Sequence, residues 1–264
     1  MARFRWASRS MCREWMPHRR LRPSRPSSGR PRSMSFRGPG NQQQVVESLH
    51  AGTIADVLDA HGVWGCLDPR ITCASAGRGP IFGEAYTIAW APVRKTADIK
   101  EAGPSTWTEV RDFLAPDVAE GSGKVYVAGA GPILETMALA GGLSCEALEG
   151  RGFEGMVLGG AIRDAHVIKR SGMPVFVSNF TPADTQGGYR VSETGGACTI
   201  GSVTVQTGDL IFGDETGVVV VPQAIAPTVI AQALEIEQVE TGIVEQIRAG
   251  KPLHELVDEE TGRI

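Results

Sequence analysis

Three short apolar runs constrain the fold of this chain more than any other feature of its sequence. They cover residues 125–128, 155–158 and 174–178, and each has the length of a buried strand. Helix-compatible stretches at 143–149 and 163–172 separate the runs. Strand, helix, strand, helix, strand at this spacing predicts right-handed βαβ crossovers and a parallel sheet.

The last third of the sequence has a different pattern. Short strands are expected at 200–205, 209–212 and 217–221, because turn residues such as glycine and aspartate separate them. A long helix is expected over 225–249, with Gly250 as its stop. The prediction is an α/β fold, a compact α/β/β/α sandwich with a parallel βαβ core, a mixed short-strand layer and a long C-terminal helix.

Before the parallel core, the sequence predicts one helix and one strand. Residues 53–62 read as a short helix that Thr53 caps and Gly62 ends. Residues 85–91 read as a strand after a Gly/Pro turn. Both segments are assigned to the same single domain as the core.

Charge divides the chain into a tail and a body. Residues 1–40 hold eleven arginines and carry +10, whereas the remaining residues carry −14. The prediction is a disordered Arg/Ser/Pro-rich tail at 1–40 and a single domain at 41–264. An over-long start before Met34 is favoured for the tail, and a transit peptide or a basic arm are the other interpretations. The acidic body argues against a nucleic-acid partner.

Two further features of the sequence bear on the cellular compartment of the protein. No run approaches the about 18–20 uninterrupted apolar residues of a membrane span, so no membrane partner is expected. The five cysteines form no CxxC pair, which favours reduced thiols. A cytoplasmic location is expected, with organelle targeting by the tail left open.

Chemistry is expected where parallel strands end in glycine, at 129–131 and 159–160. Glycine admits a ligand close to the backbone, so an anion could lie between the two turns. The Arg163 guanidinium matches a carboxylate, and Asp164 offers a hard oxygen to Mg²⁺ or Mn²⁺. In the other interpretation, Asp164 is a helix N-terminal acid and Arg163 a surface residue.

Other candidate residues are assigned structural roles. The glycines at 129–131 lack the third glycine of a dinucleotide fingerprint. Cys145 is read as a buried, inert thiol. Asp209 and Asp214 are read as turn residues before core strands.

Four sequence blocks together resemble the RraA-like family over roughly residues 44–250. They read ALAGGL at 138–143, RGFEGMVLGGAIRD at 151–164, GMPVF at 172–176 and GDLIFGDETGVVVVP at 208–222. The resemblance implies an α/β sandwich that forms homotrimers or homohexamers. It also implies a class II, metal-dependent aldolase of the 4-hydroxy-4-methyl-2-oxoglutarate / 4-carboxy-4-hydroxy-2-oxoadipate branch, which releases pyruvate and decarboxylates oxaloacetate as a side activity.

Residue roles carry over from the resemblance by position. Asp164 looks like the residue that anchors Mg²⁺, and Arg163 like the residue that binds the pyruvyl group and steadies the enolate. The loop of Gly141, Gly142, Leu143 and Ser144 looks like the one whose N–H groups hold the substrate carboxylate. An acid on the C-terminal helix, such as Glu240, is expected to reach a neighbouring subunit's site.

The chain also departs from the family pattern. Gly159 stands where an aspartate is frequent, Ala140 where a tryptophan is common, and residues 127–131 lack the usual acid. Two alternatives stay open beside the lyase. One is a non-catalytic regulator that binds a ribonuclease or another protein, and the other is a methyltransferase. The Arg163–Asp164 pair favours the enzyme, because the regulator branch typically lacks that aspartate.

Overall fold

The computed structural model describes residues 46–77, 79–93, 111–185 and 188–256, which belong to one compact unit. The expected tail at 1–40 lies outside these ranges, so the interpretations of it stay predictions. Within the described ranges, no helix combines the length and apolar character that a membrane crossing requires.

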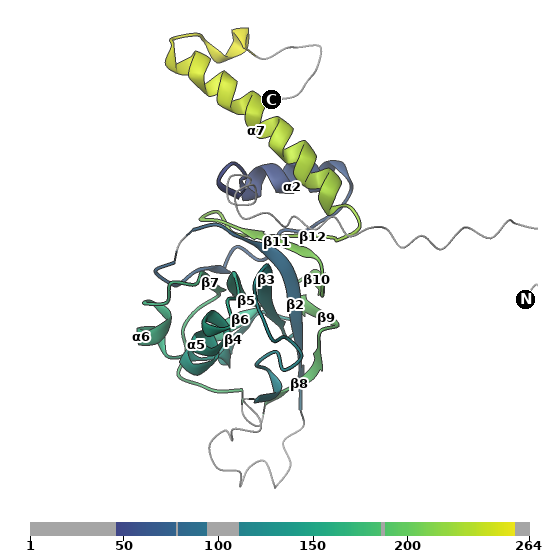
Figure 1. Cartoon of the computed structure of the whole chain (residues 1–264), viewed down its shortest axis with the longest axis vertical. Coiled ribbons are helices and arrows are strands. Elements are labelled where there is room, and N and C mark those ends of the chain that lie inside the picture. The colour runs from purple at the N-terminus through teal and green to yellow at the C-terminus, as the bar shows by residue number, and fades with distance from the viewer. Residues whose placement is uncertain (1–45, 78, 94–110, 186–187, 257–264) are drawn as a thin grey trace, which may run out of the picture. The chain divides into compact units, whose positions relative to one another are not determined.

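A mixed sheet forms the centre of the unit (Figure 1). In spatial order its strands are β1 (Thr72–Cys73), β7 (Val175–Val177), β5 (Gly155–Leu158), β3 (Lys124–Gly129), β2 (Ile81–Pro92), β11 (Leu210–Gly213) and β12 (Val218–Val221), with β8 (Tyr189–Thr194) also paired to β2. The neighbours β2, β3, β5 and β7 are parallel, and β11 and β12 extend the sheet with antiparallel pairing. The predicted α/β class and parallel core are therefore confirmed.

Two strands that the sequence did not predict lie beside this sheet. β4 (Leu134–Ala140) and β6 (Gly160–Ile162) form a separate parallel pair. They add to the crossovers made by α5 (Gly142–Gly150) and α6 (Ala165–Ile168). The predicted helix at 163–172 is only four residues long in the structure, since it begins after Asp164 and gives way to a turn at 169–170.

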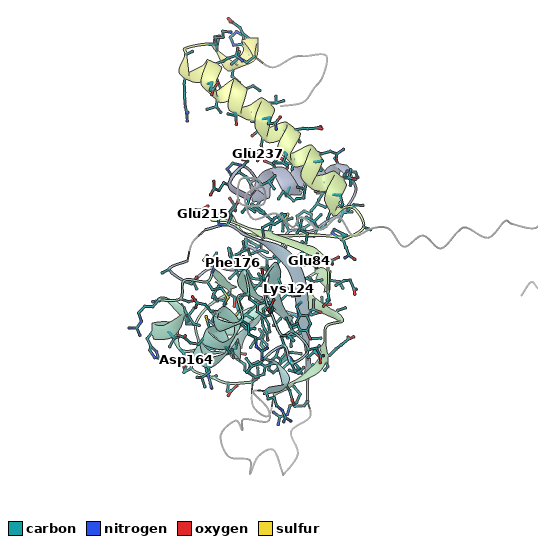
Figure 2. The ribbon with its side chains drawn as sticks, in the orientation of Figure 1. Glu84, Lys124, Asp164, Phe176, Glu215 and Glu237 are labelled. Carbon is teal, nitrogen blue, oxygen red and sulfur yellow. The ribbon has the colours of Figure 1, made fainter. Side chains whose placement is uncertain are left out.

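The concave face of the sheet is filled by a hairpin. β9 (Ala197–Ile200) and β10 (Val203–Gln206) pair across a turn at Gly201, where φ is +61°. Their inward side chains pack with the inner residues of β3, β5 and β11, and with Phe176 of β7 (Figure 2). The single strand expected at 200–205 is therefore wrong, since the chain reverses there.

Two pairs of helices cover different parts of the opposite face. α5 and α6 pack over β3, β5 and β7, whereas α2 (Ala51–Ala60) and α7 (Ala226–Arg248) pack over β11 and β12. A short 3-10 helix, η1 (Leu253–Glu255), follows α7. Gly62 and Gly250 adopt positive φ after α2 and α7, as predicted. The mixed sheet, the short-strand layer of β9 and β10 and the length of α7 confirm the expected α/β fold class and the long C-terminal helix.

Glycine at the ends of β3 and β5 serves packing rather than ligand access. A Cβ on Gly129 would lie 2.3 Å from the carbonyl oxygen of Thr199, and one on Gly159 would lie 2.9 Å from the side chain of Ile200. The hairpin thus occupies the space beside these two glycines, and the expectation of an anion between the turns that lead to Gly141 and Arg163 stays a prediction. The same contact leaves no room for a side chain at position 159.

The N-terminus of α2 is held by residues distant in sequence. Thr53 lies inside the helix and makes no cap, so the predicted N-cap is wrong. Instead, the N–H of Ala51 donates to Oδ2 of Asp214 over 2.8 Å. Asp214 Oδ1 accepts from the N–H of Thr216, and Asp209 accepts from two backbone N–H groups. The structural role predicted for both aspartates is confirmed.

A buried carboxylate links α2 to α7. Glu237 of α7 accepts hydrogen bonds from Oγ1 of Thr53 over 2.5 Å and pairs with Nδ1 of His50 over 2.9 Å. Figure 2 shows Glu237 on the part of α7 beside α2. The hydrogen bond to Glu237 raises the pKa of His50 above its ordinary value.

The His50–Glu237 pair predicts a small dependence of stability on pH. Because the folded-state pKa of His50 is raised, its contribution is present below about pH 6.5 and is lost as pH rises through the folded pKa. The His50 side chain is 68% exposed, so solvent limits the effect to less than about 1 kcal/mol. Urea unfolding of wild type and His50→Gln across pH 5.5–8.5 measures it. The two proteins should differ most at the acidic end, and a constant difference would contradict the assignment.

Candidate functional site

The parallel pairing of β4 with β6 creates the candidate site. Ala140 lies opposite Ile162 at the carboxyl ends of these strands, and the N–H of Arg163 donates to the carbonyl oxygen of Ala140 over 3.2 Å. Gly141, which follows β4, is therefore brought close to Arg163 and Asp164, which follow β6. Carboxyl ends of parallel strands are the usual location of ligands in α/β proteins.

Asp164 has an unusual backbone conformation. Its φ of +59° and ψ of +46° place it in the left-handed region, which aspartate tolerates better than most residues do. It occupies the N-cap position of α6, yet its side chain makes no bond to that helix. Its Oδ2 instead accepts the N–H of Gly142 over 2.8 Å, in the first turn of α5. Asp164 therefore stands at the N-terminal end of α6, as the alternative interpretation expected, while its side chain bonds to α5.

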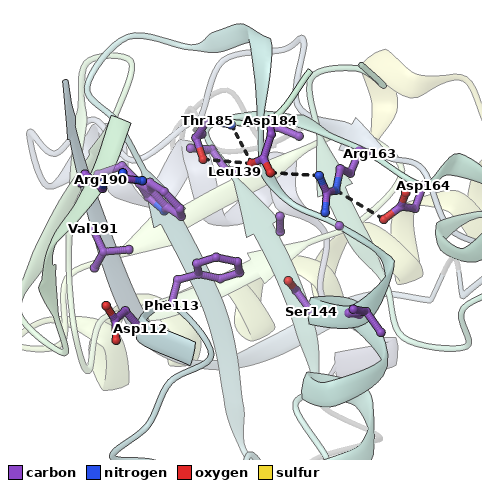
Figure 3. Close-up of a pocket in the computed structure, with 15 residues that line it drawn as sticks. Asp112, Phe113, Leu139, Ser144, Arg163, Asp164, Asp184, Thr185, Arg190 and Val191 are labelled. Carbon is purple, nitrogen blue, oxygen red and sulfur yellow. Dashed lines mark hydrogen bonds and ion pairs between the residues drawn. The ribbon is translucent and has the colours of Figure 1, made fainter. Parts of the chain in front are cut away.

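Arg163 lies between two carboxylates. Its Nε is 3.6 Å from Oδ2 of Asp164, and its Nη1 donates to Oδ2 of Asp184 over 3.0 Å. Figure 3 shows both contacts along one wall of the pocket. The three side chains are 30–39% exposed, so they reach the pocket while remaining partly enclosed.

A side chain at position 141 would disturb this arrangement. A Cβ on Gly141 would lie 2.7 Å from Oδ2 of Asp164 and 3.0 Å from Nε of Arg163. A side chain at this position would therefore displace the two charged groups that lie beside the end of β4. Gly142 is less restricted, since its nearest contacts would be 3.1 Å or more.

A cavity of about 130 Å³ opens beside these residues. One wall is charged, whereas another is formed by Trp90 and Phe113, whose ring centroids lie 5.3 Å apart. The indole Nε1 of Trp90 is buried and has no hydrogen-bond acceptor among the described residues. The lining residues are Trp90, Asp112, Phe113, Ala138, Leu139, Ala140, Gly141, Leu143, Ser144, Arg163, Asp164, Asp184, Thr185, Arg190 and Val191 (Figure 3).

The cavity brings together most of the residues selected from the sequence. Gly141, Leu143, Ser144, Arg163 and Asp164 line it. Gly142 stands behind them, bonded to Asp164. Glu240 lies on α7 and is not part of this chain's lining, so its expected contact with a neighbouring subunit stays a prediction.

Sequence reasoning missed the far side of the cavity. Asp184, Arg190, Trp90 and Phe113 come from segments that carry no motif of their own. Arg190 and Trp90 meet because β8 pairs with the end of β2, and β8 was not predicted. The mixed polar and apolar pattern of 189–194 gives only a weak strand signal. A signal for Asp184 would have been its place after the third core strand, since ligands gather at such ends.

The donor set restricts which metal the site could hold. No group of three or more His, Cys, Asp or Glu side chains converges on one point within the described ranges. Within the described ranges, the hydrogen bond from Gly142 and the ion pair with Arg163 both involve Oδ2 of Asp164. The other carboxylate oxygen, Oδ1, is therefore open to an ion. A single carboxylate oxygen fits Mg²⁺ or Mn²⁺, which retain several waters, and does not fit zinc, which requires three or four protein ligands.

Cys145 lies near the cavity in α5 but faces the core. It is 1% exposed, and its Sγ donates to Oγ of Ser171 over 3.4 Å. Burial raises the pKa of the Cys145 thiol, which disfavours the nucleophilic thiolate. The prediction of a buried, inert thiol is confirmed.

Fold and cavity together define an α/β protein with a charged cavity wall at the ends of two parallel strands. The sequence model of the RraA-like family, described as Aldolase/RraA, matches residues 52–220. The chain therefore belongs to the RraA-like family. The resemblance stated from the four sequence blocks is confirmed.

Individual relatives point in more than one functional direction. "Uncharacterized protein MJ0644" of Methanocaldococcus jannaschii is 31% identical over 67% of this chain and 78% of its own length. A Pseudomonas aeruginosa protein named "Putative 4-hydroxy-4-methyl-2-oxoglutarate aldolase" is 34% identical over 40% of this chain, and the match spans 64% of the aldolase. The crystal structure of Streptomyces coelicolor RraAS2, titled an unusual member of the RNase ES inhibitor RraA family, superposes with a TM-score of 0.63 at 25% identity, over 78% of this chain and 98% of RraAS2.

The site geometry predicts that Gly141→Ala weakens anion binding. The added methyl group would push Asp164 and Arg163 apart, so affinity for a small carboxylate such as pyruvate should fall by at least about tenfold. Gly150→Ala, at the other end of α5 where a Cβ meets nothing within 4 Å, is the matched control. Calorimetric titration of both variants tests this. Equal affinities in the two variants would contradict the close contact at Gly141.

Proposed function

We propose that this protein is a divalent-metal-dependent lyase that cleaves 4-hydroxy-4-methyl-2-oxoglutarate-type 2-oxo acids and releases pyruvate. The observation that carries the proposal is the adjacency of Arg163 and Asp164 on a cavity wall at the start of α5. Membership of the Aldolase/RraA family and the aldolase named among the relatives support it. Decarboxylation of oxaloacetate is proposed as a side activity, because it passes through the same pyruvate enolate.

The substrate carboxylate would bind at the N-terminus of α5. The first N–H groups of a helix have no partner within the helix, and the helix dipole favours an anion there. Leu143 and Ser144 line the cavity in this first turn. The N–H of Gly142 already bonds to Asp164, so the donors proposed for the substrate are those of Leu143 and Ser144, together with the Arg163 guanidinium.

Mg²⁺ or Mn²⁺ is the proposed cofactor, with Oδ1 of Asp164 as its protein ligand. When bound, it would supply Lewis-acid polarisation of the 2-keto group and neutralise negative charge there. Asp164 is suited to this role because Gly142 fixes one carboxylate oxygen and thereby directs the other. The proposed ion is thus held by one side chain, waters and the substrate.

Arg163 would act on the charge that develops during cleavage. When the bond between C3 and C4 breaks, its electron pair moves into the pyruvyl fragment and gives the enolate, while the C4 hydroxyl would lose its proton to a nearby water and become the carbonyl group of the second product. Protonation of the enolate at C3 would then give pyruvate. The guanidinium is already oriented by two carboxylates, so little reorganisation is needed to donate hydrogen bonds to that charge. The Trp90–Phe113 wall limits water on the other side, which strengthens this interaction.

The far end of the cavity would receive the C4 end of the substrate. Figure 3 shows Arg190 and Arg163 on opposite sides of Asp184. Arg190 offers a second cation, and the buried Nε1 of Trp90 is a donor without an acceptor among the described residues. Two cationic ends separated by an apolar wall suit a 2-oxo diacid better than a monoacid.

Homotrimers or homohexamers are proposed as the working assembly. The outer part of α7 exposes Val239, Val244 and Ile247, which are 57%, 40% and 42% exposed. Apolar side chains on one projecting helix support contacts with further copies of the chain. A cytoplasmic location is proposed on the reduced cysteines, since Cys66, Cys73, Cys145 and Cys198 are all unpaired thiols.

A regulator that binds a ribonuclease is the second candidate function. The likeness to RraAS2, whose title refers to an RNase ES inhibitor family, favours it. The two candidate functions differ in whether they require Asp164. A lyase requires its carboxylate to anchor the metal, whereas a protein-binding regulator does not. A stoichiometric ribonuclease complex without lyase activity on any 2-oxo acid would favour the regulator.

The lyase proposal predicts that Asp164→Asn abolishes metal-dependent turnover. Asparagine retains an oxygen for the N–H of Gly142 and loses only the charge, so kcat/KM for pyruvate release should fall at least about 100-fold. Pyruvate release from 2-oxo acids with Mg²⁺, Mn²⁺ or chelator measures it. Asp59→Asn, an exposed change on α2, is the control. Unchanged turnover in Asp164→Asn would overturn the metal-site assignment.

A further inference from the structure

Asp184 is an acid of the cavity to which neither the family pattern nor the sequence blocks assign a role. It lies between β7 and β8, in a segment that runs beside β4: the N–H of Ala138 donates to the carbonyl oxygen of Ala183 over 2.9 Å, and Ala138 bridges to Asp184 itself. Asp184 is therefore attached to the strand that leads into Gly141. Its position is set by the same backbone framework as the rest of the site.

The Asp184 carboxylate is fixed on one side by its neighbour. Its Oδ1 accepts the N–H of Thr185 over 2.7 Å and Oγ1 of Thr185 over 3.3 Å. Thr185 is 5% exposed, and its carbonyl oxygen accepts the N–H groups of Gly188 and Tyr189. Because this buried, hydrogen-bonded threonine holds Oδ1 of Asp184, the other oxygen, Oδ2, has a defined direction.

That direction is toward Arg163. Oδ2 of Asp184 accepts from Nη1 over 3.0 Å, while Nε faces Asp164 at 3.6 Å. A guanidinium carries five donors on three nitrogens. Within the described part of the chain, these two contacts engage Nη1 and Nε, and Nη2 makes no ion pair or hydrogen bond. Asp184 and Asp164 therefore hold two of the three guanidinium nitrogens, and the third remains for a substrate.

We propose that Asp184 is the positioning residue for Arg163, and this inference rests on the lyase function proposed above. A free arginine side chain loses much of its rotamer freedom when it binds a ligand. A carboxylate that is itself anchored removes much of this cost in advance. Such supporting contacts typically change activity or affinity by about 10–100-fold when they are removed.

Loss of the Asp184 carboxylate should destabilise mainly the transition state. Arg163 meets the largest negative charge when the enolate develops, so a misplaced guanidinium should lower kcat more than it raises KM. Asp184→Ala should therefore reduce kcat by about 10–100-fold. Asp184→Glu, which retains a carboxylate, should recover part of the loss. A purely structural role would instead lower thermal stability and leave kcat per folded molecule unchanged.

A double-mutant cycle tests whether Asp184 acts through Arg163. Asp184→Ala, Arg163→Ala and the double variant are compared in pyruvate release with Mg²⁺ and in affinity for oxalate, a planar dianion that resembles the enolate. The loss caused by Asp184→Ala should disappear in the Arg163→Ala background. Asp68→Ala is the matched control, because Asp68 pairs with Arg70 at the exposed surface away from the cavity lining.

The outcomes separate this inference from the function on which it rests. A wild-type protein that turns over 2-oxo acids and shows additive losses in the double variant would overturn the positioning role alone. Wild-type kcat in Asp184→Ala would do the same. A wild-type protein that neither releases pyruvate nor binds oxalate would overturn the lyase proposal, and the role of Asp184 with it.

Discussion

The hydrogen bond from the N–H of Gly142 to Oδ2 of Asp164 is the interaction on which the site depends. It joins the first turn of α5 to the end of β6, and it holds Asp164 in its left-handed conformation. It forms because β4 and β6 run parallel and end side by side. The close approach in turn requires Gly141 to have no side chain. Backbone geometry therefore determines where the charged groups of the site stand.

Electrostatic balance explains how these charged groups can coexist. One guanidinium between two carboxylates leaves a net charge of about −1, which suits a divalent cation better than a lone anion. A bound divalent ion would make the net charge of the wall positive, which would suit an anionic 2-oxo acid at the N-terminus of α5. The partial exposure of all three side chains limits the cost of bringing the charges together. We therefore expect the metal ion and the substrate to bind to the same preformed wall of the cavity.

The sequence predicted the elements whose pattern is local. Runs of apolar residues identified β3, β5 and β7, and their spacing identified the parallel sheet. The pair Arg163–Asp164 was selected from its position after a core strand. The family resemblance, which the match over 52–220 confirms, added the loop at 141–144.

What the sequence did not predict depends on contacts between distant segments. β6 reads as a turn because it is short and begins with Gly160, and only its pairing with β4 makes it a strand. Glycines 129 and 159 suggested ligand access, yet the hairpin of β9 and β10 fills that space. Asp184 was overlooked because its partner, Arg163, lies 21 residues away. Such contacts arise from tertiary packing, which local propensity does not encode.

Binding of Mn²⁺, followed by its electron paramagnetic resonance signal, is the most direct test of the central claim that Asp164 anchors a divalent ion. The account predicts one Mn²⁺ per chain, with an affinity that rises when oxalate is present and is lost in Asp164→Asn. Equal Mn²⁺ binding by wild type and Asp164→Asn, with no effect of oxalate, would contradict it.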